Sequence, residues 1–116
     1  MTNKIDLRTL LSNSKRTLDE KLTLFLWLNL GVVESLANGL LTATQAVRLF
    51  FNAENCLFVR QEITEKGADV IMSHGVQLAD LFDALPPEDA QRQFQSEVAV
   101  MRSLCLNMLK KKRLAA

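Results

Sequence analysis

The sequence predicts an all-α fold, a compact bundle of five to six helices of unequal length around a central hydrophobic helix. Hydrophobic residues make up 48% of the 116 residues and charged residues 23%, with four Gly and two Pro, which is typical of a globular chain. Residues 22–33, LTLFLWLNLGVV, are rich in Leu and carry no charge. Most other apolar residues recur at the three- and four-residue spacing of a helix face. A chain of this length is expected to form one domain, residues 1–116.

The central helix is predicted to run from about residue 18 to residue 37. Thr17 followed by Glu20 has the capping-box spacing, and the pair Asn38-Gly39 is typical of a helix end. On a helical wheel Asn29 falls within the apolar face. Its amide is either a polar contact with a ligand or a dimer partner, or a group satisfied by a neighbouring backbone, and we favour the second interpretation.

A second capping pattern, Thr42 with Gln45, begins the next predicted helix. Residues 52–66 are more ambiguous because CLFV, within residues 56–60, is compatible with a short strand. The helical spacing of Cys56, Val59 and Ile63 favours a helix.

Glycine and proline divide the second half of the chain. Gly75 is predicted to end the helix containing ADVIMSH. The spacing of the apolar residues between 78 and 85 predicts a short amphipathic helix that Pro86-Pro87 would stop. The last helix is predicted over residues 87–111, since Pro suits a first helical turn. We expect residues 1–16 to pack loosely and residues 110–116 to form a basic tail.

Membrane insertion and secretion are both disfavoured by the sequence. The uncharged run at residues 22–33 is shorter than the roughly 20 apolar residues that a membrane span requires. The N-terminal residues lack the continuous apolar stretch of a signal peptide. Cys56 and Cys105 are far apart in sequence and are interpreted as reduced, buried thiols. We therefore expect a cytoplasmic protein.

No arrangement of residues in the sequence predicts catalysis. His74 is the single histidine, so we expect it to have a structural role unless folding brings it to a cysteine. The acidic pairs Glu62/Glu65 and Asp80/Asp83 are interpreted as solvated faces rather than metal ligands. The expected protein is not an enzyme and has no catalytic residues, no cofactor and no metal.

The function that these observations favour is a protein–protein interaction module, such as an adaptor, a regulator or an immunity-type inhibitor. Its partner would be another protein or a second copy in a homodimer, and the apolar side chains predicted to contact it are Trp27, Phe50, Phe51, Leu106 and Leu109. The alternative is a nucleic-acid-associated regulator that uses the basic residues Lys110, Lys111, Lys112 and Arg113. Nucleic acid is the less favoured partner because the net charge is only +1.

Overall fold

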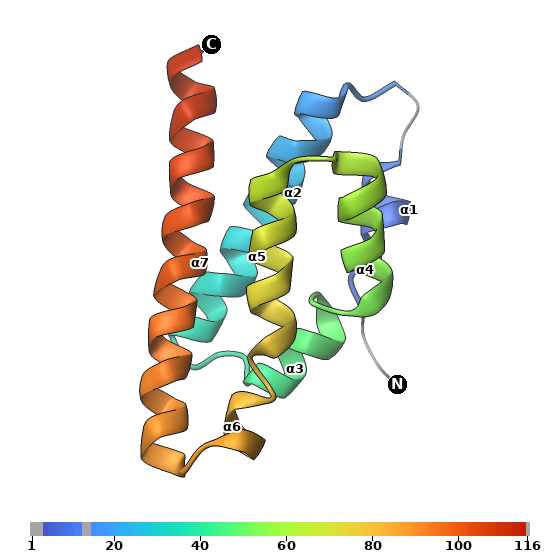
Figure 1. The fold of residues 1–116 in the computed structure, drawn as a ribbon. Coiled ribbons are helices and arrows are strands. Elements are labelled where there is room, and N and C mark those ends of the chain that lie inside the picture. Colours follow the sequence, from blue (N-terminus) through green and yellow to red (C-terminus); the bar gives the residue numbers. More distant parts are fainter. Residues whose placement is uncertain (1–3, 13–14, 116) are drawn as a thin grey trace.

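The computed structural model describes residues 4–12 and 15–115, without the side chains of residues 113–115, and the described part of the chain is all-α (Figure 1). The helices are unequal in length, as predicted. In chain order they are α1 (Leu7–Leu11), α2 (Leu18–Ala37), α3 (Ala43–Leu49), α4 (Ala53–Phe58), the π-helical turn η1 (Val59–Ile63), α5 (Lys66–Gln77), α6 (Leu81–Ala84) and α7 (Pro87–Ala115).

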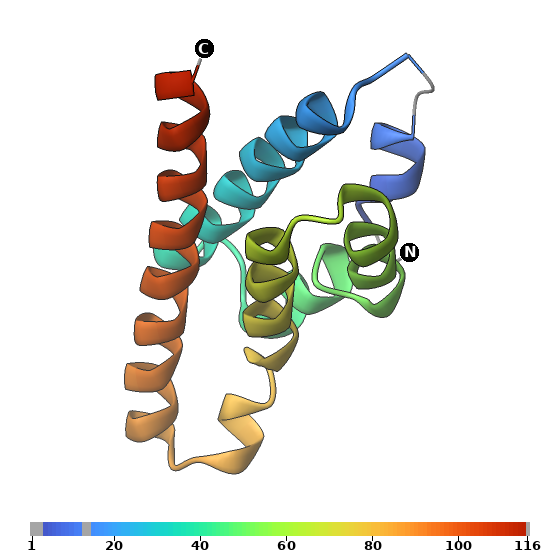
Figure 2. The same ribbon diagram turned by 45° about the horizontal axis from the view of Figure 1, so that its top comes forward.

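Helix α2 is the central helix that the sequence predicts, with the predicted bounds. Thr17 and Glu20 form both hydrogen bonds of the capping box. The buried face of α2 includes Phe25, Leu26 and Val33, and it packs against α7, the other long helix (Figure 2). Among the described helices, none is both long enough and apolar enough to cross a membrane.

Contacts along the whole length of α2 hold it to α7. Asp19 pairs with Lys112 near one end and Glu34 with Arg102 near the other. Between them, the buried thiol of Cys105 donates to the carbonyl oxygen of Leu26 over 3.1 Å. The two helices therefore meet through apolar side chains flanked by ion pairs.

The ambiguous residues 56–60 are helical. Helix α4 continues into η1 without a break, and η1 ends at Thr64, whose φ of 54° is left-handed. Phe58, Val59 and Ile63 are buried by this arrangement. The predicted helix is thus confirmed, with a π-helical turn that side-chain spacing alone does not reveal.

The predicted end of α5 at Gly75 is wrong, because the helix continues to Gln77. Gly75 faces the ring of Phe51, and a Cβ atom on Gly75 would lie 2.6 Å from Phe51 Cε1 and closer still to Cγ and Cδ1. This glycine allows two elements to approach closely, a role distinct from ending a helix. The helix predicted after it is reduced to the single turn α6, since Leu78 belongs to the core beside the end of α5.

Residues 4–12 are docked against the core, contrary to the loose packing expected for residues 1–16. Leu7 and Leu11 of α1 are buried. The buried side chain of Asn55 accepts a hydrogen bond from the Leu7 amide over 3.1 Å and donates to the carbonyl oxygens of Ile5 and Phe50 over 2.7 and 2.9 Å. Residues 1–3 and 13–14 of that segment lie outside the described residues.

Candidate functional site

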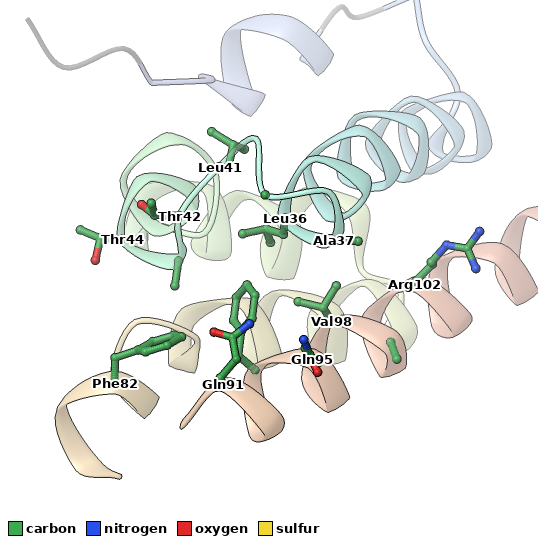
Figure 3. Close-up of a pocket in the computed structure, with 14 residues that line it drawn as sticks. Leu36, Ala37, Leu41, Thr42, Thr44, Phe82, Gln91, Gln95, Val98 and Arg102 are labelled. Atoms are coloured by element: carbon green, nitrogen blue, oxygen red, sulfur yellow. The ribbon is translucent and has the colours of Figure 1, made fainter. Parts of the chain in front are cut away.

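A groove of about 730 Å³ lies between the α2–α3 connection on one side and α6 and α7 on the other (Figure 3). Its apolar lining consists of Leu36, Ala37, Gly39, Leu41, Ala43, Phe82, Phe94, Val98 and Ala99. Its polar lining consists of Thr42, Thr44, Gln91, Gln95 and Arg102. The volume falls within the range of small-molecule ligand sites, and the mostly apolar lining is typical of them.

The upper wall of the groove in Figure 3 is built where α2 ends and α3 begins. Gly39 takes the left-handed conformation, with φ of 72°, and donates its amide hydrogen to the carbonyl of Leu36 over 3.3 Å. Thr42 then caps α3 through a second capping box with Gln45, as the sequence predicts. This wall is therefore fixed by two helix ends, each held by hydrogen bonds between residues that are close together in the sequence.

The opposite wall is one face of α7. Gln91, Gln95, Val98 and Arg102 follow one another at spacings of four, three and four residues, so they form one stripe along the helix. Pro87 begins α7, as predicted. Arg102 is paired with Glu34 of α2, which ties this end of the groove to the opposite wall.

Phe82 closes the other end of the groove from α6. Its ring lies 5.6 Å, centroid to centroid, from the ring of Phe94. The side chain nevertheless stays 44% exposed, and Figure 3 shows it directed across the groove. A large aromatic surface in a groove wall is typical of a contact with a partner.

The lining contains no Asp, Glu, His, Cys or Ser among the residues that the structure describes. The two threonine hydroxyls have no adjacent base in the lining, and that of Thr42 already accepts the amide hydrogen of Gln45. The groove thus offers apolar contact, two threonine hydroxyls, two primary amides and one paired guanidinium.

The structure corrects part of the predicted partner-binding set. Phe50 and Phe51 are core residues: the ring of Phe50 stacks on Phe25 at 6.0 Å and meets Phe51 edge-on at 5.1 Å. The periodicity of the sequence places both on an apolar face but does not show which elements cover that face. Trp27 is 59% exposed and Leu106 and Leu109 are half-buried, and none of the three lines the groove.

The predicted basic tail is the last turns of α7. Lys110 and Lys111 are exposed, Lys112 pairs with Asp19 at the start of α2, and the side chain of Arg113 lies outside the described residues. Arg16, at the same end of α2, donates to the carbonyl of Leu10. The basic charges near the start of α2 are therefore partly engaged by the protein itself.

Asn29 is fully buried, and its two amide atoms have no hydrogen-bond partner among the described residues. The expectation that a neighbouring backbone satisfies it is wrong. The amide lies beside the thiol of Cys105, whose pKa is raised by burial and lowered to a smaller extent by this contact. The thiol hydrogen itself is directed to Leu26.

His74 has a carboxylate partner. Its Nδ1 atom lies 2.5 Å from Oε2 of Glu97, which joins α5 to α7, and both side chains are largely covered. Cys56, on α4, is half-buried, and burial raises the pKa of its thiol. Within the described residues, no group of three or more His, Cys, Asp or Glu side chains is placed to hold a metal ion.

No protein-family model matches the chain, and neither a curated protein nor a solved structure is significantly similar to it. Sequence reasoning did not identify the groove, because its walls come from segments that only the fold brings together. The local signal was a polar stripe on the last helix, where Gln91, Gln95 and Arg102 recur at helical spacing.

Proposed function

We propose that this protein is a protein-binding module and that the groove between the α2–α3 connection and α6–α7 takes a short, uncharged, apolar segment of the partner. The observation that carries the proposal is the groove itself: an apolar surface with an exposed aromatic ring at one end and a paired arginine at the other. The lining of the groove defines the class of segment.

The lining of the groove selects against charge in that segment. Arg102 is the one charged residue among those lining the groove that the structure describes, and Glu34 already neutralises it. A charged side chain brought into the apolar part would lose its hydration without gaining a partner. Gln91 and Gln95 carry amides that can donate to and accept from a peptide backbone, and their four-residue spacing, about 6 Å along a helix, is close to the repeat of two residues in an extended chain.

The proposal is tested by selecting peptides from a random display library on the immobilised protein. We expect enriched peptides to be uncharged and rich in apolar residues where they bind. Ala99→Glu would place a carboxylate in the groove lining at an exposed position. We expect it to weaken binding of the selected peptides at least about 10-fold, measured by fluorescence polarisation, because the carboxylate must be desolvated.

Val100→Glu is the matched control for this experiment. Val100 is adjacent on α7 and exposed, but it does not line the groove. Peptides that bind the wild type and Val100→Glu equally, and Ala99→Glu weakly, support the groove as the site. Failure to enrich any peptide, or equal binding to all three proteins, contradicts the proposed function.

A further inference from the structure

A polar side chain without a partner lies where α7 packs on α2. Asn29 is fully buried, and both polar atoms of its carboxamide lack a hydrogen-bond partner among the described residues. The amide lies beside the thiol of Cys105, but that thiol donates its hydrogen to the carbonyl oxygen of Leu26. The closed packing of α7 on α2 therefore keeps one amide away from water without giving it a partner, which is unfavourable.

Cys105 is also the last residue of α7 whose described side chain is buried. Residues 106–112 include no buried side chain, and the apolar ones among them are half-buried. The ion pair at this end joins Lys112 to Asp19, whose side chain is 79% exposed, so water and salt screen it. The last turns of α7 are thus held to the core by few buried contacts, which is typical of a segment that opens locally.

The turns of α7 before Cys105 are held more firmly. Val98 and Met101 are buried in the core, and Arg102 pairs with Glu34 of α2. Opening of the helix from residue 103 onward would leave these three contacts in place. The boundary between firmly and weakly held turns therefore falls between Arg102 and Cys105.

From these observations we infer that residues 103–115 of α7 open as a unit while the rest of the protein stays folded, and that Asn29 shifts the balance toward the open form. The amide is unpaired in the closed form, whereas water can bond to it in the open form. Opening converts Cys105 from a buried thiol into one that solutes reach. None of the described residues after Arg102 lines the groove, so this device is separate from the proposed binding site.

Cys105 is itself the reporter of the opening. The protein is labelled with iodoacetamide under native conditions, and mass spectrometry of the labelled peptides gives the rate at Cys105, with Cys56 as an internal reference. We expect the rate at Cys105 to be nearly independent of urea at low urea concentrations, because opening of a short segment exposes little surface. Labelling through global unfolding would instead rise steeply with urea.

Two variants test the roles of the amide and of the opening segment. Asn29→Leu is expected to slow the labelling of Cys105 by about 10-fold or more, because the closed form no longer contains an unpaired amide. Leu109→Ala is expected to speed it by about 5-fold or more, because the segment loses a half-buried apolar contact. Labelling of Cys56 should be the same in both variants as in the wild type.

Gly31→Ala is the matched control for Asn29→Leu. Gly31 lies on the same helix, but nothing lies within 4 Å of a Cβ atom placed there, so the substitution stabilises α2 without changing its contact with α7. We expect Gly31→Ala to leave the rate at Cys105 unchanged. If Cys105 reacted only through global unfolding, both variants would slow labelling in proportion to the stability that each gains in urea denaturation.

Three results would overturn the inference: a rate at Cys105 that rises with urea as steeply as global unfolding, a rate that Asn29→Leu leaves unchanged, or a rate that follows global stability in Gly31→Ala as well. Circular dichroism confirms that each variant is folded before its rate is compared. Peptide selection on the groove is a separate measurement, so the failure of this inference would leave the proposed function standing.

Discussion

Gly75 of α5 lies directly against the ring of Phe51, at a distance that leaves no room for a Cβ atom on the glycine. Phe51 is buried in the middle of the connection between α3 and α4, and its ring meets that of Phe50 edge-on. This contact sets how closely α5 approaches the aromatic centre of the core.

Gly75→Ala is expected to lower the free energy of unfolding by about 1–3 kcal/mol, because an extra methyl group in a filled core displaces its neighbours. Gly31→Ala is the control. Gly31 is also within a helix, but nothing lies within 4 Å of a Cβ placed there, so we expect a gain of about 0.5–1 kcal/mol from helix propensity. Urea denaturation of both variants measures the difference, and two changes of the same sign would show that the Phe51 contact does not decide the effect.

Asn29→Leu is expected to raise the free energy of unfolding by about 1–3 kcal/mol. The buried amide has no hydrogen-bond partner among the described residues, and an apolar side chain of similar volume removes its desolvation cost. Thermal denaturation measures the change. A lower Tm for Asn29→Leu would show instead that a buried water satisfies the amide in solution.

Asn55→Ala is expected to release the N-terminal segment. The substitution leaves the Leu7 amide and the carbonyls of Ile5 and Phe50 without their hydrogen-bond partner, at a cost of about 3 kcal/mol. Hydrogen exchange should show faster exchange of the Leu7 and Leu11 amides. Asn52→Ala, which removes the cap of α4 and the hydrogen bond from Asn52 to the Arg48 carbonyl but no contact with the N-terminal segment, is expected to leave those amides protected. Equal exchange in both variants would mean that apolar contacts alone hold α1.

The two thiols are expected to react slowly with iodoacetamide. Burial raises the pKa of both Cys56 and Cys105, so at pH 8 each carries less thiolate than in the unfolded chain, and labelling should rise at a higher pH in the native protein than in urea. Cys105, which is fully buried, should react after the half-buried Cys56. Mass spectrometry of labelled peptides gives both rates, and native labelling as fast as in urea would contradict the expectation.

The same shifts give stability a pH dependence. Because the pKa is raised, the folded protein keeps the thiol proton at pH values at which the unfolded chain has begun to lose it. This stabilising contribution is complete below the unfolded pKa of about 9.0 and is lost as pH rises through the folded value.

The elements that could be predicted from the sequence are those determined by near neighbours. Three helix starts were predicted correctly: those capped by Thr17 and Thr42 and the one at Pro87 of α7. Each depends on interactions over only three or four residues. Gly75 was misinterpreted because the same residue type ends helices and permits close packing, and its partner is a residue distant in sequence.

The candidate site depends on distant contacts even more strongly. Phe50 and Phe51 are aromatic residues of the kind found in binding surfaces, but α2 and α5 cover them. Asn55, whose hydrogen bonds reach back by 48 and 50 residues, had no local pattern to distinguish it from a surface amide. The groove could be predicted only if it were known that the turn after α2 faces the first half of α7.

The pairing of α2 with α7 determines when the chain can complete its core during synthesis. The contacts between these helices join residues separated by 68, 79 and 93 positions. The most apolar helix therefore leaves the ribosome long before the helix that covers it has been made. The nascent chain must carry that uncovered face through most of its translation, which makes early termination within α7 a route to aggregation rather than to a smaller stable domain.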